Sequence, residues 1–142
     1  MSKIRNLVIG TALAALAVGA TPLTAQAADT SPSSPPSAAA TGLLHVYYET
    51  EYSGWCDDWS GEAPDWGSCR NKVSSLHNNG YPGNLDDIWV YWGLNYTGAR
   101  RGVYQGVGLT DLRFYHFDAN TGPGSGESLN NNISSHRWTN LP

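Results

Sequence analysis

The chain contains an internal repeat in which two short elements occur in the same order in each half. The first element is an aromatic residue, a second aromatic five positions later and a glycine two positions after that. It spans residues 47–54 and 91–98. The second element ends in a Ser-Ser pair and spans residues 70–75 and 130–135. Each half alone has few apolar residues to bury, so the repeat predicts two units packed face to face around one core.

The residues of the repeat and the segments around it favour an all-β fold. We expect the glycine to take a backbone angle that a side chain would forbid, and the serines to hydrogen-bond a neighbouring turn. Turn-forming residues separate short segments rich in aromatic and β-branched residues, and no segment of helical length shows a sustained helical period. These segments predict strands at residues 45–48, 88–92, 102–104 and 112–115.

The two ordered elements resemble those of the microbial βγ-crystallin superfamily. Each Greek-key motif of that family has an aromatic-x-x-x-x-aromatic-x-Gly hairpin and an (Asn/Asp)-(Asn/Asp)-x-x-(Ser/Thr)-Ser loop. The second half matches both elements, whereas the first half has Arg70 where the loop takes Asn or Asp. The resemblance implies an all-β domain of two Greek-key motifs, about residues 45–87 and 88–140, packed as a βγ-crystallin-type sandwich.

The first 42 residues are expected to lie outside this domain, which we place at residues 43–142. Lys3 and Arg5 precede an apolar stretch, and Ala25 and Ala27 form the small-x-small pattern of a signal peptidase site. Residues 1–27 therefore read as a signal peptide, and the Pro/Ser/Ala-rich residues 28–42 as a disordered linker. The sequence predicts a secreted, extracellular and monomeric protein with no membrane span.

Export also predicts the state of the two cysteines, Cys56 and Cys69. In an oxidising compartment a disulfide between them is the default. A structural zinc site would need further ligands nearby, and none have the spacing for it.

The resemblance implies calcium sites at the two loops of the repeat. In the family, the Asn/Asp and hydroxyl positions supply side-chain oxygens, and a hairpin of the partner motif adds a backbone carbonyl. The implied ligands are Asn130, Asn131 and Ser134 in one clamp, Asn71 and Ser74 in the other, and the carbonyl groups of Glu49 and Gly93.

The charges of the two loops predict weak Ca²⁺ binding. The second loop offers amides and hydroxyls without a carboxylate, which predicts a dissociation constant of about 10⁻⁴ to 10⁻³ M. In the first loop, Arg70 and Lys72 place positive charge beside the cation. The alternative is that both loops are structural turns that bind no metal.

Within the superfamily, residues 71–80 and 134–138 are similar to secreted bacterial inhibitors of metalloproteinases, the SMPI type. This likeness implies a protein that inhibits an extracellular protease. The disulfide-closed segment 56–69 is the preferred inhibitory loop, because we expect the glycine-rich segment 117–127 to be flexible. Trp55, Trp59 and Trp66 are candidate partner-binding residues, unless they only cover the disulfide.

Other classes of function fit the sequence less well. The chain has neither a His-Glu-x-x-His nor a Gly-x-Ser-x-Gly motif, and we predict that it is not an enzyme. The formal net charge of −4 argues against a nucleic-acid partner. The sequence thus favours a secreted, non-enzymatic protease inhibitor. The alternatives are a calcium-stabilised structural or stress protein and a glycan-binding or toxin-like module.

Overall fold

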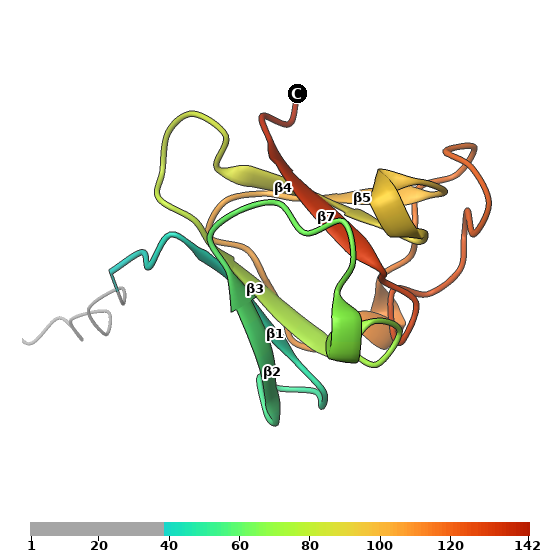
Figure 1. Ribbon diagram of the computed structural model, residues 1–142, viewed down its shortest axis with the longest axis horizontal. Coiled ribbons are helices and arrows are strands. Elements are labelled where there is room, and N and C mark those ends of the chain that lie inside the picture. The colour runs from blue at the N-terminus through green and yellow to red at the C-terminus, as the bar shows by residue number, and fades with distance from the viewer. Residues whose placement is uncertain (1–38) are drawn as a thin grey trace, which may run out of the picture. The chain divides into compact units, whose positions relative to one another are not determined.

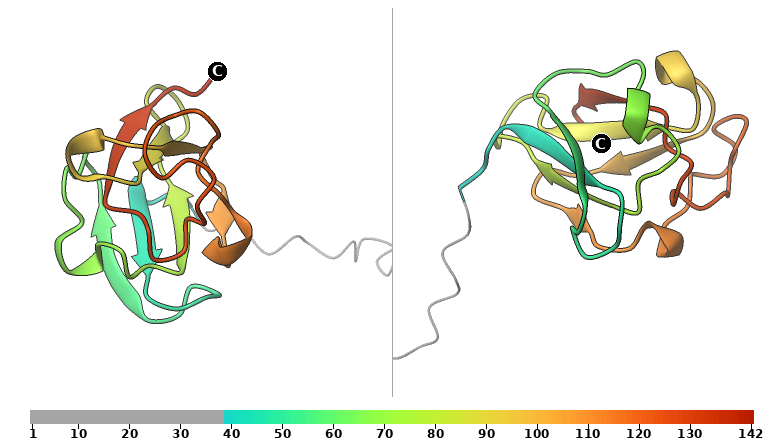
Figure 2. Two further views of the ribbon diagram at one scale, coloured as in Figure 1. Left: turned by 90° about the vertical axis from the view of Figure 1, so that its right-hand side faces the viewer. Right: turned by 60° about the horizontal axis from the view of Figure 1, so that its bottom comes forward.

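The computed structural model describes residues 39–142. The predicted signal peptide and residues 28–38 of the predicted linker lie outside the described residues. The described part forms two antiparallel sheets (Figure 1; Figure 2 gives two further views). The first sheet has the strand order β2-β1-β3-β6 and the second β5-β4-β7. The strands are β1 (Leu43–Tyr47), β2 (Trp55–Trp59), β3 (Ser75–Asn79), β4 (Asp87–Tyr91), β5 (Arg100–Val103), β6 (Gly108–Leu109) and β7 (Ser135–Thr139).

Each half of the chain pairs with the sheet of the other half, the second half through a strand and the first half through a single bridge. Strand β6 belongs to the second half but pairs with β3, with Leu109 opposite Leu76. In return, Ala63 of the first half forms a bridge to His136 on β7. This exchange is the connectivity of two interlocked Greek-key motifs, and it confirms the all-β sandwich expected from the repeat.

The two repeat hairpins adopt the same backbone conformation. Glu51 and Tyr52 have φ of 55° and 58°, and their counterparts Asn95 and Tyr96 have φ of 53° and 61°. The glycine that ends each hairpin also has a positive φ, as its sequence pattern predicts. The paired aromatic rings pack together, with centroids 5.6 Å apart in the first hairpin and 6.0 Å in the second.

The core lies between the two sheets and follows the alternation of the strands. In β1 the buried residues are every second one, whereas β4 is buried at four of its five positions. Loop residues complete the core on both sides. Its buried apolar side chains include Leu44, Val46, Trp66, Val73, Leu76, Ile88, Val90, Val103, Leu109, Leu112, Phe117, Leu129 and Ile133.

The strand predictions are right for β1, β4 and β5 and wrong for residues 112–115. Leu112–Phe114 form a short 3₁₀ turn, labelled η5, in place of a strand. Asp111 holds this turn, because its carboxylate accepts hydrogen bonds from the backbone and side chain of Arg113. Strands β2, β3, β6 and β7 were not predicted. Strands β2, β3 and β7 contain many polar residues, and β6 has only two residues, so it is pairing with a neighbouring strand that places them in the sheets.

Residues 117–127 are not the flexible segment that their glycines suggest. The backbone of Phe117 pairs with Glu127, and the hydroxyls of Thr121 and Ser125 close turns within the segment. Gly124 lies so close to the Trp92 ring that a Cβ atom there would be 2.3 Å from it. The glycine therefore permits close packing of the segment onto Trp92.

The disulfide between Cys56 and Cys69 is present in the structure. The tryptophans near it do not form an exposed cluster, as the partner-binding hypothesis requires. Trp66 is only 1% exposed, and Trp59 stacks on it and packs against the core. Trp55 alone of the three is well exposed, at 61%. Among residues 39–142, no helix is long and apolar enough to cross a membrane.

Candidate functional site

The two loops of the repeat, loop 1 (residues 70–75) and loop 2 (residues 130–135), lie beside each other and are joined by reciprocal hydrogen bonds. The backbone N–H of Asn71 donates to the carbonyl of Ile133 at 3.0 Å, and that of Asn131 donates to Val73 at 3.0 Å. Both asparagines have a positive φ, 58° and 59°. Each asparagine side chain consequently meets residues of the opposite half.

Hollow B, a surface depression beside the second hairpin, collects oxygen atoms from both halves of the chain. The hydroxyl of Ser134 lies 3.2 Å from Oδ1 of Asn71 and 2.9 Å from the backbone oxygen of Trp92. Gly93 and Asn132 also line this hollow. An amide oxygen, a hydroxyl oxygen and a carbonyl oxygen thus converge within hydrogen-bonding distance.

Hollow A is the corresponding depression beside the first hairpin. Ser74 and Asn131 line it together with Tyr48, Glu49 and Lys72. Hollow A therefore resembles hollow B in having one serine from the near loop and one asparagine from the far loop, and Asn71 lines both hollows. Hollow A also contains one positive and one negative side chain, Lys72 and Glu49.

The two predicted clamps lie differently in the structure. Asn71 and Ser74, the side chains of the first clamp, both line hollow A. Asn71 also lies beside Ser134 in hollow B, whereas Asn131 lines hollow A and is separated from Ser134 of its own loop. Asn130 lines neither hollow, and its buried Oδ1 has no hydrogen-bond partner.

The backbone carbonyl groups of Glu49 and Gly93, which were predicted as calcium ligands, already accept hydrogen bonds. The hydroxyls of Ser75 and Ser135 donate to them, each at 2.6 Å. The same hydroxyls accept from the backbone N–H groups of Tyr52 and Tyr96. The second serine of each loop therefore holds the hairpin in place, and the first serine is the one that faces the hollow.

Glu127 is a residue of hollow B that the sequence did not reveal. It ends the segment 117–127, and the indole N–H of Trp92 donates a hydrogen bond to its carboxylate. Arg70 also lines this hollow and lies 3.8 Å from Asp65 in an ion pair. By sequence, Arg70 is expected beside the first site, and no carboxylate is expected at the second. Since 57 positions separate Arg70 from Glu127, only the fold brings them together.

The donor atoms of hollow B suit a hard cation. Ca²⁺ prefers carboxylate, amide, hydroxyl and backbone carbonyl oxygens, and accepts water for the remaining positions. All four kinds of oxygen occur here, from Glu127, Asn71, Ser134 and Trp92. Within residues 39–142, no group of three or more His, Cys, Asp and Glu side chains is placed to hold a metal ion.

A second candidate site is the exposed segment 60–65 inside the disulfide loop. Its middle residue, Ala63, exchanges backbone hydrogen bonds with His136 at 3.0 and 3.2 Å. The carbonyl of Gly61 accepts hydrogen bonds from the imidazole of His136 and the indole of Trp138. Ser60, Glu62, Pro64 and Asp65 are exposed. The segment is therefore held at several points while most of its side chains face solvent.

Comparison with known proteins identifies the fold and nothing narrower. No protein-family model matches the chain, and no curated protein matches it. A solved structure from work on the evolution of the eye lens βγ-crystallin domain fold matches 72% of this chain and 90% of its own, at 18% identity and a TM-score of 0.54. A βγ-crystallin from Ciona intestinalis matches 68% of this chain and 99% of its own, at 12% identity and a TM-score of 0.50. The described part of the chain thus has the βγ-crystallin fold.

Proposed function

We propose that this protein is a secreted, non-enzymatic domain that binds Ca²⁺ in hollow B and is stabilised by it. The observation that carries the proposal is that Ser134 Oγ lies 3.2 Å from Asn71 Oδ1 and 2.9 Å from the Trp92 carbonyl oxygen. These oxygens come from both halves of the chain. A bound cation would therefore cross-link the two motifs that must pack together to form the core.

The charges around the hollows predict which of them binds better. Glu127 supplies a carboxylate to hollow B, and Arg70 opposes the cation there. In hollow A, Lys72 opposes the cation, and the only carboxylate belongs to Glu49. Because both sites are open to solvent and have few carboxylates, we expect dissociation constants of about 10⁻⁴ to 10⁻³ M, with hollow B tighter.

The test is thermal and chemical unfolding with 0 to 20 mM CaCl₂. A ligand that binds only the folded state at about 10⁻³ M should add about 2 kcal/mol to the free energy of unfolding at the highest concentration. Ser134→Ala should abolish most of this gain, and Arg70→Gln should increase it. Ser60→Ala is the matched control, since Ser60 is exposed and lies outside both hollows.

For each protein, the quantity compared is the difference between its free energies of unfolding with and without Ca²⁺. MgCl₂ should have a much smaller effect, because Mg²⁺ requires a tighter octahedral site. If the unfolding curves of the parent protein are the same with and without Ca²⁺, the loops are structural turns and the proposal is wrong.

A second candidate function, inhibition of a secreted protease, is favoured by segment 60–65. An inhibitory loop must be rigid, because rigidity limits the entropy lost on binding. The disulfide, the Ala63 bridge and the bonds to the Gly61 carbonyl together supply that rigidity. With Trp66 and Trp59 packed inward, the contacts with a protease would come from Glu62, Pro64 and Trp55.

This second candidate is tested by titrating the purified protein against a panel of secreted metalloproteinases, with serine proteinases as controls. Stoichiometric inhibition that Pro64→Gly weakens would support it. The hypothesis fails if micromolar protein slows none of the enzymes, or if the segment is simply cleaved.

A further inference from the structure

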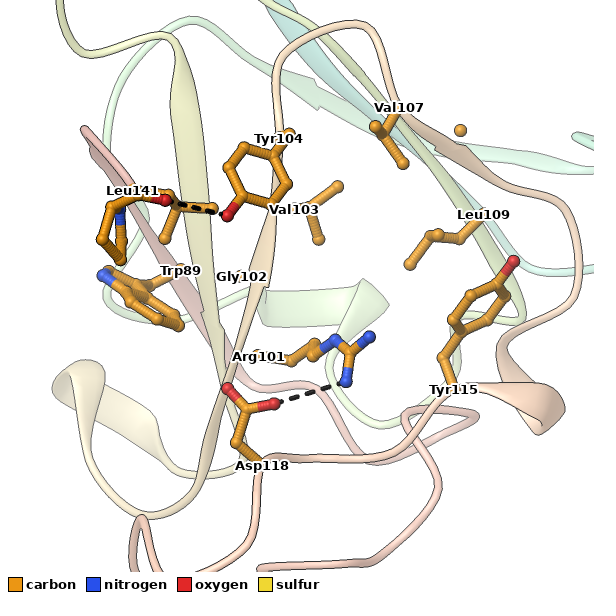
Figure 3. Close-up of a pocket in the computed structure, with 12 residues that line it drawn as sticks. Trp89, Arg101, Gly102, Val103, Tyr104, Val107, Leu109, Tyr115, Asp118 and Leu141 are labelled. Carbon is orange, nitrogen blue, oxygen red and sulfur yellow. Dashed lines mark hydrogen bonds and ion pairs between the residues drawn. The ribbon is translucent and has the colours of Figure 1, made fainter.

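A pocket lies at one edge of the sandwich, between strand β5 of one sheet and strand β6 of the other (Figure 3). It is distinct from hollows A and B and shares no lining residue with them. Its volume of about 400 Å³ falls within the range of small-molecule sites. The pocket therefore has the size for one or two rings of an organic ligand.

Aromatic and aliphatic side chains form two of its walls. Figure 3 shows Trp89, Tyr104 and Leu141 along one side, and Leu109 and Tyr115 along the other. Tyr104 is 53% exposed, so part of this residue is open to a ligand. Aromatic rings in such positions contact flat ligands over a large area at a small cost in entropy.

A charged pair forms the polar end of the pocket. Nη1 of Arg101 lies 3.3 Å from Oδ1 of Asp118, and both side chains remain well exposed, at 42% and 37%. A guanidinium has five donors and a carboxylate has about four acceptor positions, so most of their hydrogen-bonding capacity is unused in this contact. Together they offer donors and acceptors with no net charge.

The walls are fixed in place without a ligand. The hydroxyl of Tyr104 donates to the carbonyl of Pro142, and the backbone N–H of Leu141 donates to Asp87. On the outer side, the guanidinium of Arg100 lies 4.3 Å from the centre of the Trp89 ring. A ligand that enters would therefore need little reorganisation of the protein.

We propose that this pocket binds a neutral sugar ring of a glycan. The apolar C–H face of a pyranose fits against aromatic rings, as the exposed part of Tyr104 allows. Its hydroxyls both donate and accept, which matches Asp118 and Arg101 acting together. An anionic ligand would leave Asp118 opposed to it, and a purely apolar ligand would desolvate the ion pair without replacing its bonds to water. The site is thus a binding function separate from the calcium proposal.

The test uses NMR titration of the purified protein with four neutral oligosaccharides: cellohexaose, chitohexaose, xylohexaose and maltohexaose. At least one of them should shift the backbone amide signals of Gly102 and Tyr104 in a saturable manner at millimolar concentration. Oligogalacturonate serves as the acidic probe and should bind more weakly. The titrations are run with Ca²⁺ and with EDTA, so that failure of the calcium proposal does not affect the outcome.

Two substitutions identify the pocket as the site. Arg101→Gln and Tyr104→Ala should each weaken binding by about tenfold, since each removes a main contact of the ring. Arg137→Gln is the matched control, because Arg137 is also an exposed strand arginine with one carboxylate partner, Glu62 at 3.4 Å. Thermal unfolding of each variant checks that it is folded.

Three results would overturn the proposal. The first is that none of the neutral probes shifts the signals of the pocket. The second is that Arg101→Gln affects binding no more than Arg137→Gln does, or that oligogalacturonate binds most tightly. The third is that the pocket is occupied by a second copy of the chain, seen in sedimentation as a dimer that Arg101→Gln dissociates.

Discussion

At the scale of single residues, His136 is a buried histidine whose two ring nitrogens both form hydrogen bonds. Its ring is fully buried and packs against Trp59 and Trp66 of the disulfide loop. The indole N–H of Trp66 donates to Nδ1 at 2.8 Å. Nε2 therefore carries the hydrogen and donates to the Gly61 carbonyl at 2.8 Å. Both nitrogens are satisfied in the neutral form only, and burial lowers the pKa of His136 to about 4.

This lowered pKa predicts a loss of stability in mild acid. The unfolded chain takes up a proton at the ordinary histidine pKa of 6.5, whereas the folded protein does so only near pH 4. Above pH 7 neither state is protonated at this site, so its contribution there does not vary with pH. As the pH falls from about 6.5 to 4, the free energy of unfolding should drop by about 3 kcal/mol through this residue.

Urea unfolding between pH 7.5 and pH 4 measures this loss. Because carboxylates titrate over the same range, the loss is compared with that of His136→Gln, which lacks the titrating group. The variant should lose less stability between the two pH values than the parent protein. His116→Gln, at an exposed position, is the control and should behave as the parent does. Equal losses in all three proteins would contradict the assignment.

At the scale of elements, the disulfide loop and the segment 117–127 are the main segments that lie outside the two repeated elements. The disulfide closes a loop of 13 positions and joins edge strand β2 to the 3₁₀ turn η3 (Gly67–Cys69). Segment 117–127 packs on Trp92 and brings Glu127 to hollow B. The disulfide loop therefore fixes the exposed segment 60–65, and segment 117–127 adds the negative charge of Glu127 to hollow B.

Removal of the disulfide should destabilise the fold strongly. Cys56→Ala is expected to lower the free energy of unfolding by about 2 to 5 kcal/mol, because the unfolded chain gains conformational freedom. Denaturant unfolding measures this change, and the parent protein after reduction should show a similar loss. Two thiols that react readily in the native oxidised protein would contradict it.

Loss of the Glu127 carboxylate should weaken Ca²⁺ binding at hollow B. Replacement of Glu127 by Gln removes the carboxylate and should reduce the Ca²⁺-dependent gain in stability several-fold, since it removes the one negative charge among the donors. Glu62→Gln, at an exposed site outside the hollow, is the control. An unchanged response to Ca²⁺ in Glu127→Gln would show that this carboxylate takes no part.

At the scale of the whole described domain, the halves depend on each other. Each sheet receives a strand or bridge from the opposite half, and the core contains side chains from both. The reciprocal bonds between Asn71 and Ile133 and between Asn131 and Val73 join the halves again at the hollows. Neither half has a complete sheet or a covered core by itself.

The halves should consequently fail to fold when they are produced separately. Residues 39–86 and residues 87–142 are each expected to give poorly dispersed NMR spectra, because an isolated half exposes the apolar face of its sheet. Mixing the two should restore dispersion if the strand exchange can form between chains. Cooperative thermal unfolding of either half alone would show that the exchange is not required.

Local sequence determined those features of the fold that depend mainly on residues close together in the chain. The spacing of Tyr47, Tyr52 and Gly54, and its copy in the second half, predicted two hairpins with strained backbone angles. The repeat and the short aromatic segments predicted an all-β sandwich, and the two cysteines predicted the bridge. In each case the signal lies within a few residues or in a simple count, so no tertiary contact was needed.

Tertiary structure decided the composition of the candidate sites. Asn71 lines both hollows, and Asn131 lies in hollow A away from Ser134 of its own loop, because the two loops pack side by side. The inward position of Trp66 depends on its hydrogen bond to His136, 70 positions away. The edge pocket exists only because β6 crosses to the other sheet and leaves a gap beside β5. Such contacts join residues that are far apart in the chain and follow no regular spacing. They form only because the two sheets pack together.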